Sequence, residues 1–481
     1  MNMVSPAPVP IVVDLDGSLI LTDTLHEQLV RAVFHHPLTL LRSLPEMLHG
    51  RLAFKATLSA MAPLAAETLP LRADLVAWLD AQRALGRHVH LATAAHQSIA
   101  DSIAGRLPWL ASATGSHSVN LKGPAKAARL QGAFPGGFTY VGDSAADLAV
   151  WPAATAIVLA GASPTTARAA RALGKPVEAE FLAEPAGRFG QWHDWVRAMR
   201  VHHWSKNVLL LLPLVLGHAW SDHYAILQTL AGLVLLLAVT SSTYLLNDLA
   251  DLESDRLHWS KRLRPIASGR IPALTALVAG AAGIVLAVGL ALLFSRALAA
   301  TLAAYVGLTL AYSFGLKRVP LLDTMVIGLL FTLRITMGVA VLHQPYPQWL
   351  LTFAAFFFSS LALAKRHTEI LRAGTLGGAS LASRGYVPED AALTLALGVG
   401  TAIASLVIMT LYLTEDAFHS ITYEHTGWLW GIPMLLAIWI GRIWLLAHRG
   451  RLLDDPVSFA LRDRPSLALG GAVLAAFLLA L

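Results

Sequence analysis

Residues Asn247–Asp255, with the sequence NDLADLESD, place carboxylates directly after a long apolar segment, Leu227–Leu246. Three of them, Asp248, Asp251 and Asp255, recur at positions i, i+3 and i+7. At about 100° per residue they would lie on one face of a helix, within an arc of roughly 60°. Like charges that close repel each other unless a cation lies between them. Because the ligands are all oxygens, with no His or Cys among them, the pattern predicts Mg²⁺ rather than zinc or iron.

Magnesium held by a few carboxylates usually completes its octahedron with water and substrate phosphate. A carboxylate group at the rim of a membrane helix therefore indicates an enzyme that handles a diphosphate beside lipid. The alternative is a solvated acidic helix end. The enzyme is favoured because charge inside or next to a membrane segment is costly and usually functional.

The composition of the 481-residue chain is that of a membrane protein with a soluble part. Hydrophobic residues make up 56% and charged residues 14%, against about 45–50% and 25% in soluble domains. Residues 1–182 have a soluble α/β pattern, 183–204 form a linker with an interfacial helix, and 205–481 are membrane-like. The net charge of +6 indicates basic loops beside anionic lipid and not a nucleic-acid partner. Cysteine is absent, which excludes disulfides and thiolate metal sites.

Hydropathy predicts nine membrane spans, each near the roughly 20 residues that a crossing helix needs. They are 206–220, 224–246, 274–294, 297–314, 321–342, 347–364, 391–413, 427–447 and 466–481. Lys and Arg gather in alternate connections, whereas Arg296 is the only one in the opposite set. The positive-inside rule then predicts a multi-pass protein of a bacterial-type inner membrane, with its N-terminal domain in the cytoplasm and its C-terminus outside.

Residues 192–481 resemble the UbiA superfamily of intramembrane prenyltransferases, whose NDxxDxxxD motif matches residues 247–255. Within it the decaprenyl-phosphate phosphoribosyltransferase branch is the most similar. Its likeness is carried by VRAMRVHHWSKN (196–207), SKRLRPIASGRIP (260–272), YSFGLKRVPLLD (312–323), AKRHTEI (364–370) and DDPVSFALRD (454–463). The resemblance implies nine helices, Mg²⁺, and transfer of phosphoribose from phosphoribosyl pyrophosphate to a polyprenyl phosphate. Where aromatic prenyltransferases carry a second paired-aspartate motif, this chain offers Asp323 alone.

The site residues that follow from this reading are acidic and basic. Asp248, Asp251 and Asp255 would hold Mg²⁺ on the pyrophosphate, and Asn247 would orient a phosphate or ribose oxygen. Basic side chains would bind the phosphates: Lys261, Arg262 and Arg264 as a clamp, and Lys317, Lys365 and Arg366 for the 5-phosphate or the lipid phosphate. The alternative for each basic residue is that it serves only the charge bias of the cytoplasmic loops.

The N-terminal part places two carboxylates, Asp14 and Asp16, after an apolar strand and before a glycine, in VPIVVDLDGSLILTDT (9–24). Carboxylates in this position suit a phosphatase nucleophile and its acid–base partner. Three further segments follow in order, HVHLATAAH (88–96), NLKGPAKAARL (120–130) and FTYVGDSAADLAVW (138–151). Strands that alternate with helices predict a parallel α/β sheet with ligands at the carboxyl ends of its strands.

These four segments resemble the motifs of the haloacid dehalogenase superfamily, over about residues 9–182. The resemblance implies a Rossmann-like domain in which the helical residues 22–79 form a cap. Asp14 would attack phosphorus and Asp16 would act as acid and base. The remaining implied roles are Mg²⁺ binding by Asp14, Asp16 and Asp143, support of the metal site by Asp147, and phosphoryl binding by Thr93 and a lysine, Lys126 in preference to Lys122.

Three functions are compatible with these resemblances. The first is a bifunctional enzyme whose membrane domain makes a polyprenyl-phosphoryl phosphoribose and whose soluble domain removes the 5-phosphate. The second is an aromatic prenyltransferase that uses a polyprenyl diphosphate, with a soluble domain that acts on an unrelated phosphate. The third keeps the soluble domain as a scaffold. The first is preferred because its two activities are consecutive steps that both face the cytoplasm, where fusion raises the effective concentration of the intermediate.

Overall fold

The computed structural model describes residues 8–43, 45, 50–181, 188–376, 384–419, 423–452 and 455–481. Their contacts divide the chain into two compact units. The first unit comprises Met1–Met199 and Tyr244–Gly280, and the second comprises Arg200–Thr243 and Ala281–Leu481. The predicted linker at 183–187 lies outside the described residues, and the helix α8, Arg188–Ala198, follows it.

The first unit contains a six-stranded parallel sheet of order β3-β2-β1-β4-β5-β6. Its strands are β1 Ile11–Val13, β2 Val89–His96, β3 Ser112–Ser116, β4 Thr139–Gly142, β5 Ala156–Ala160 and β6 Val177–Phe181. The β-branched run of β1 is fully buried and pairs on both sides, with Ile11 opposite Val89 and Thr139. The sheet confirms the predicted parallel α/β architecture, and β1 at its centre brings its carboxyl end beside that of β4.

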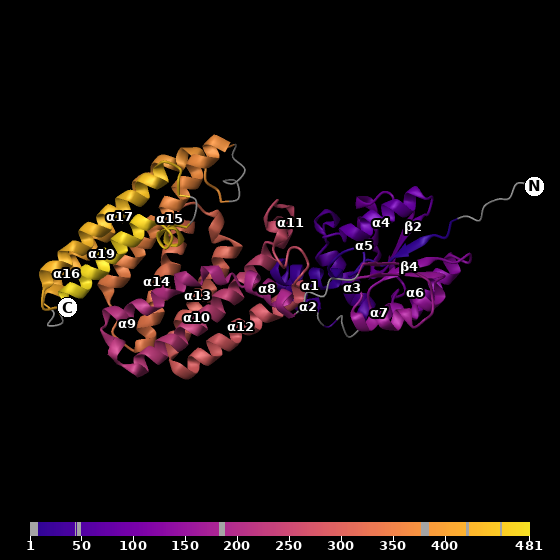
Figure 1. Cartoon of the computed structure of the whole chain (residues 1–481), viewed down its shortest axis with the longest axis horizontal. Helices are drawn as coiled ribbons and strands as arrows, with labels where there is room; N and C mark the ends of the chain where they lie inside the picture. The colour runs from indigo at the N-terminus through magenta and orange to yellow at the C-terminus, as the bar shows by residue number, and fades with distance from the viewer. Residues whose placement is uncertain are drawn as a thin grey trace, which may run out of the picture. The chain divides into compact units, whose positions relative to one another are not determined.

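Helices cover both faces of this sheet (Figure 1). The helices α4 Ala73–Ala84 and α5 Gln97–Arg106 pack on one face, where Leu75, Leu79 and Ile103 are buried. The helices α6 Pro124–Ala133 and α7 Pro164–Arg171 pack on the other, together with the 3₁₀ helices η3 Ala145–Ala149 and η4 Trp151–Ala153. The two apolar layers fix the strands, and thereby the loops that follow them.

A small helical group lies between β1 and α4 in sequence. It consists of α1 Thr24–His35, α2 Pro37–Ser43, α3 Arg51–Met61 and the short η2 Ala66–Thr68. Asp23 caps α1 by accepting the backbone N–H of His26, and apolar residues of the three helices form a core of their own. The helices occupy the region predicted as a cap. That prediction ran to Leu79, which lies in α4 and packs against the sheet.

The apolar helices make up most of the second unit. Seven helices of the described chain are long and apolar enough to cross a membrane. They are α10 His223–Ala250, α12 Ala273–Phe294, α13 Arg296–Phe314, α14 Leu322–Leu342, α15 Gln348–Leu376, α16 Ala391–Glu415 and α17 Gly431–His448. The first predicted span is instead divided into η5 Val201–Leu211 and α9 Leu212–Leu216, and the last, α19 Arg464–Ala480, has 17 residues.

Short elements connect these helices. They are η6 Ala219–Ser221, α11 Leu252–Leu257, η7 Lys261–Leu263, η8 Leu316–Arg318, η9 Pro388–Asp390, η10 Ala417–His419, η11 Thr426–Trp430 and α18 Pro456–Ala460. The second unit has two main buried clusters, one formed chiefly by α14, α15 and α17 and the other by α10, α12, α13 and α14. The ends of α10 and α12 that adjoin α11 and η7 belong to the first unit, as does the acidic stretch, Asn247–Asp255.

Candidate active sites

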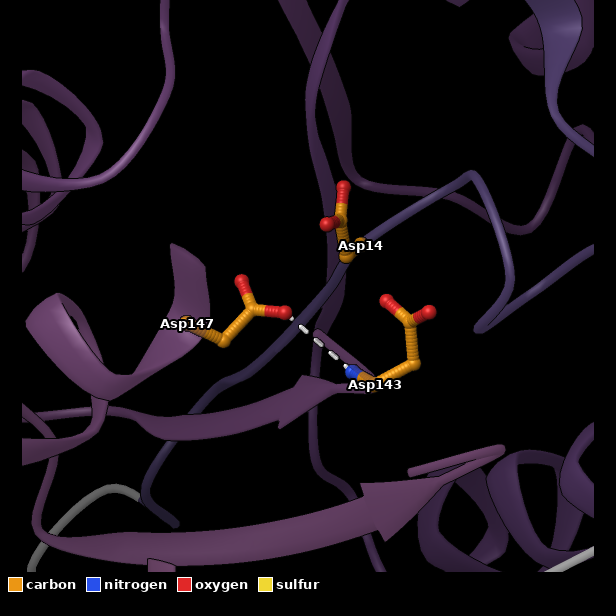
Figure 2. A group of neighbouring side chains, drawn as sticks. All are labelled: Asp14, Asp143 and Asp147. Atoms are coloured by element: carbon orange, nitrogen blue, oxygen red, sulfur yellow. Dashed lines mark hydrogen bonds between the residues drawn. The ribbon is translucent and has the colours of Figure 1, made fainter. Parts of the chain in front are cut away.

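The carboxyl ends of β1 and β4 bring Asp14, Asp143 and Asp147 together, and these three residues are named the carboxylate cluster here. One oxygen from each lies within 4.8 Å of the others, and Figure 2 shows the three side chains as neighbours. Asp147 accepts the backbone N–H of Asp143 at 3.2 Å and of Ser144 at 2.9 Å, and the hydroxyl of Tyr140 at 2.8 Å. Asp147 is thus held by donors, which leaves Asp14 and Asp143 as the better placed metal ligands.

Lys126 is buried in α6 and contacts the predicted nucleophile. Its Nζ lies 3.0 Å from Asp14 Oδ1 and donates to the Tyr140 hydroxyl at 3.0 Å. Asp14 Oδ1 also accepts the backbone N–H of Leu15 at 2.8 Å. Lys122, the alternative left open by the sequence, is exposed. The structure therefore brings Lys126, and not Lys122, into an ion pair with Asp14.

Burial perturbs the titration of these acids. Burial, reinforced by the charge of Asp14, raises the pKa of Asp143 to about 8. Burial and the neighbouring Asp23 raise the pKa of Asp16 to about 7. The pKa of Asp14 is also raised by burial, against the opposing effect of Lys126. Carboxylates crowded in this way, at the end of a parallel sheet, fit a divalent cation held by oxygen ligands.

The loop that leads from Asp16 to α1 is fixed by a glycine turn and by hydrogen bonds. Gly17 has a φ of +72°, and a Cβ there would overlap the carboxylate of Asp143. Arg72 donates to the carbonyl oxygens of Gly17 at 2.7 Å and Ser18 at 3.0 Å. Asp16 Oδ1 accepts the backbone N–H of Thr24 at 2.7 Å. Only glycine fits at position 17, because the backbone is left-handed and the carboxylate is adjacent.

A cavity of about 700 Å³ opens at these strand ends and is lined by Asp14, Asp16 and Asp143. The strand β2 contributes Ala94, Ala95 and His96 to its wall. The sequence predicted that β2 ends at Thr93, but the strand continues to His96. Its pairing shifts after Ala92, and the buried Thr93 hydroxyl accepts the backbone N–H of Ala95 at 3.0 Å. Thr93 therefore has a partner within its own strand.

The acidic stretch does not form one uninterrupted helix. The helix α10 ends at Ala250, and α11 begins at Leu252 after Asp251. The backbone N–H of Asp251 bonds to Asn247 and that of Asp255 to Asp251, so the helical path nearly continues. The Asn247 amide donates to Asp251 Oδ2 at 3.3 Å.

Arg264 lies between two of the three motif carboxylates. Its Nη1 donates to Asp248 Oδ1 at 3.2 Å and to Asp255 Oδ2. Asp248 and Asp255 are 4% and 1% exposed, and burial raises the pKa of Asp255 although Arg264 opposes this. Asp255 Oδ1 is buried without a hydrogen bond, and Lys261 Nζ lies 3.7 Å away. A buried carboxylate oxygen left without a donor fits a metal ligand.

Among the described residues, the oxygens of the acidic stretch do not converge on one point as those of the carboxylate cluster do. The sequence predicted Mg²⁺ between these carboxylates, and in the structure the guanidinium of Arg264 contacts two of the three. Arg262, predicted as part of the phosphate clamp, is exposed. Lys317, Lys365 and Arg366 belong to the second unit.

Arg366 has structural partners in the second unit. Its Nη2 lies 2.7 Å from Asp323 Oδ2, and its Nη1 donates to Glu369. The Tyr386 hydroxyl donates to the other oxygen of Asp323 at 2.6 Å. The single aspartate of the predicted second motif is thus fully buried in an ion pair.

A further buried cation, Arg334 in α14, escaped the sequence analysis. Its guanidinium donates to Asn207 Oδ1 at 2.9 Å and to the Tyr305 hydroxyl at 2.8 Å. Its position within an apolar helix was the available signal, because charges inside membrane segments usually have a function.

Comparison with known proteins identifies the membrane part. The profile of the UbiA prenyltransferase family matches residues 210–462. The chain belongs to this family. It is 44% identical to the uncharacterized protein y4nM of Sinorhizobium fredii over 98% of this chain and 91% of that one. It is 31% identical to the decaprenyl-phosphate phosphoribosyltransferase of Mycobacterium tuberculosis over 56% of this chain and 88% of the relative.

A solved UbiA homolog from Archaeoglobus fulgidus bound to GPP and Mg²⁺ is 14% identical and covers 59% of this chain and 99% of its own, with a TM-score of 0.45. Family membership and the seven apolar helices make this chain a multi-pass membrane transferase of the UbiA superfamily.

Proposed function

We propose that the chain transfers 5-phosphoribose from phosphoribosyl pyrophosphate to a polyprenyl phosphate and then removes the 5-phosphate from the product. The observation that carries the first step is the acidic stretch, where two buried carboxylates share the guanidinium of Arg264. Similarity to a decaprenyl-phosphate phosphoribosyltransferase supports this choice of donor and acceptor.

In the transfer step, a phosphate oxygen of the lipid attacks C1 of the ribose. The bond from C1 to the pyrophosphate oxygen breaks, and pyrophosphate leaves with the electron pair. The acceptor is already an anion, so no general base is needed. Mg²⁺ held by Asp248, Asp251 and Asp255 would neutralise charge on the departing oxygens. Arg264 and Lys261, which already contact these carboxylates, would bind the phosphates.

The remaining predicted ligands have less direct support. Asn247 would orient a ribose or phosphate oxygen, and Arg262, Lys317 and Lys365 would bind phosphate. Arg366 is the weakest member of this set because its guanidinium is paired with Asp323 and Glu369. We assign Arg366 to holding α15 against the start of α14, where Asp323 lies.

In the second step, Asp14 of a haloacid dehalogenase-like domain would attack the 5-phosphate. Because Asp14 Oδ1 is engaged by Lys126 and the backbone of Leu15, Oδ2 is the oxygen assigned to the attack. The phosphorus–oxygen bond to the sugar breaks, Asp16 protonates the leaving oxygen, and water then hydrolyses the aspartyl phosphate. A second Mg²⁺, bound by Asp14, Asp143 and the carbonyl of Asp16, would offset the charge of the phosphoryl group.

An aromatic prenyltransferase is the second candidate, because the matching family is described as one of prenyltransferases. The geometry of Asp323 weighs against it. That carboxylate is fully buried and bonded to Arg366 and Tyr386, so it is a poor ligand for a second diphosphate-bound metal.

Mass spectrometry of the lipid product tests the proposal. Purified protein receives phosphoribosyl pyrophosphate, polyprenyl phosphate and Mg²⁺, with wild type, Asp14→Asn and Asp255→Asn side by side. We expect ribose-lipid from wild type, phosphoribose-lipid from Asp14→Asn and no lipid product from Asp255→Asn. Phosphoribose-lipid from both wild type and Asp14→Asn would refute the phosphatase step. In a parallel reaction the protein receives polyprenyl diphosphate and an aromatic acid. A prenylated aromatic acid from that reaction, with no lipid product from the first, would refute the transfer step.

A further inference from the structure

A buried ion pair joins the helical group after β1 to the segment after the acidic stretch, within the first unit. Arg256 Nη1 and Nη2 donate to Glu27 Oε2 at 2.8 Å and Oε1 at 2.6 Å. The side chains of Arg256 and Glu27 are 5% and 4% exposed. Arg256 Nε donates to the carbonyl oxygen of Ala267 at 3.0 Å, so the guanidinium has partners on both of its edges. A second ion pair, Arg31 with Glu253, joins the same two helices, α1 and α11.

Such a pair fixes geometry more than it adds stability. Burial of two charges is expensive, and the attraction between them repays it only when the hydrogen bonding is complete. Here both carboxylate oxygens and all three guanidinium nitrogens are engaged. The exposed pair of Arg171 and Glu180 in the same unit represents the ordinary surface case.

The segment that this pair holds in place forms a wall of the cavity above the carboxylate cluster. Gly269, Pro272, Ala273, Leu274 and Thr275 line that cavity together with Asp14 and Asp16. Gly269 has a φ of +81°, and a Cβ there would lie 3.1 Å from Leu21 Cβ and 3.0 Å from Thr22 Cγ2. The close approach places the residues that follow the acidic stretch directly against the loop that follows Asp16.

The wall also brings the start of an apolar helix to the cavity. Ala273 begins α12, one of the helices that are long and apolar enough to cross a membrane. A substrate whose phosphate lies at Asp14 therefore has the first turn of a membrane helix beside it in the same cavity. Leu21, Leu25 and Leu274 add apolar surface there. A free sugar phosphate has no apolar part that these residues could contact. A lipid-linked sugar phosphate would match both the carboxylates, with its phosphate, and the apolar residues beside α12, with its lipid.

We propose that residues 269–275 select the phosphatase substrate, a phosphomonoester on a lipid-linked sugar, and that Glu27 and Arg256 are positioning residues for this wall. The inference rests on the proposed function and deepens it, because it names the residues that select the lipid-linked substrate of the second step. It explains why the phosphatase is part of the same chain as the transferase: the transferase segment completes the phosphatase cavity.

The first test concerns geometry alone and needs no substrate. The natural chain has no cysteine, so Arg31→Cys with Glu253→Cys introduces the only two thiols. The full-length protein in detergent is treated with a short bis-methanethiosulfonate reagent and mapped by peptide mass spectrometry. We expect peptides containing positions 31 and 253 to be linked in most molecules, and each single-cysteine variant to give only mono-modified peptide. Absence of the linked peptides would overturn the proposal.

The second test separates the two substrate classes. Arg256→Gln removes the pair by changing a residue that does not itself line the cavity, whereas its partner Glu27 does. Glu180→Gln is the matched control at the exposed pair. Each protein receives ribose 5-phosphate or, separately, phosphoribosyl pyrophosphate with polyprenyl phosphate. For Arg256→Gln we expect ribose 5-phosphate hydrolysis within twofold of wild type and at least tenfold slower dephosphorylation of the lipid product. The charge-swapped pair Glu27→Arg with Arg256→Glu should recover part of the lost rate.

Each other result contradicts the proposal in a recognisable way. Equal loss on both substrates would make Arg256 a general support of the fold, and no loss on the lipid product would make the wall irrelevant to selection. If wild type forms neither phosphoribose-lipid nor ribose-lipid although positions 31 and 253 cross-link in the double-cysteine variant, the transferase proposal fails and the substrate class falls with it. If Arg256→Gln makes phosphoribose-lipid and dephosphorylates it at the wild-type rate, the inference alone is overturned and the proposed function stands.

Discussion

Replacing Lys126 by methionine removes the cation that contacts Asp14 and keeps nearly the same side-chain volume. At the observed 3.0 Å, and with an effective dielectric constant near 20, the lost attraction is about 5 kcal/mol. Asp14 has a less costly response, since protonating a carboxyl of ordinary pKa at pH 7 costs about 4 kcal/mol. We therefore expect Asp14 to take up a proton, because burial already raises its pKa and Lys126 opposes that rise.

A protonated Asp14 is no nucleophile, and the phosphoryl oxygens also lose a buried cation. Removal of one such electrostatic contact lowers kcat by about 10²–10³-fold, so dephosphorylation by Lys126→Met should fall at least 100-fold at pH 7. Transfer of phosphoribose should continue, and phosphoribose-lipid should accumulate in the mass-spectrometric assay. Lys122→Met is the control, because Lys122 lines the same cavity but is exposed and is not paired with Asp14, and its rate should stay within about threefold of wild type. This reasoning would be refuted if Lys126→Met dephosphorylated the lipid product at the wild-type rate, or if only Lys122→Met lost activity.

Three further predictions concern the two sites. Asp255→Asn should lower phosphoribosyl transfer at least about 100-fold, measured as phosphoribose-lipid formed, while ribose 5-phosphate hydrolysis stays unchanged. Gly17→Ala should abolish dephosphorylation and lower the free energy of unfolding by at least about 1–2 kcal/mol, because a Cβ at φ +72° is strained and overlaps Asp143. Without divalent cation, the melting temperature of the first unit should fall as the pH rises from about 5 to 8. The folded-state pKa values of Asp16 and Asp143, about 7 and 8, exceed those of an unfolded chain, so stability present at low pH is lost as the pH rises through them. Addition of Mg²⁺ at pH 8 should restore it, and Asp143→Asn should weaken both effects in a thermal-shift assay.

The sheet of the first unit could be predicted because its signals are local. The β-branched residues of β1 and the glycine after Asp16 identify a strand and a turn without reference to the rest of the chain. The preference for Lys126 was likewise local, since it was expected to lie at the start of a helix, and α6 does begin at Pro124. The predicted end of β2 was wrong because the strand extends through pairing with β3, which resumes at His96 opposite Ser116 after a shift of register, and such long-range pairing is not encoded in local propensity.

The acidic stretch shows where periodicity stops being informative. The spacing of Asp248, Asp251 and Asp255 placed them on one helix face, and the nearly continuous helical hydrogen bonding is compatible with that expectation. The spacing said nothing of Arg264, whose guanidinium reaches two of the three carboxylates from beyond α11. A basic residue in a cytoplasmic loop looks the same in sequence whether it biases topology or neutralises a site.

The contact between Glu27 and Arg256 marks the limit of sequence reasoning for this chain. A glutamate in the first turn of α1 has a sufficient local explanation, because acidic residues favour helix N-termini. An arginine directly after Asp255 has one too, as a cytoplasmic charge beside a membrane helix. The two residues are 229 positions apart, and neither explanation predicts that the pair would be buried. Burial of both charges with complete hydrogen bonding fixes α1 against α11 and the carbonyl of Ala267, and the wall at residues 269–275 follows directly in the chain.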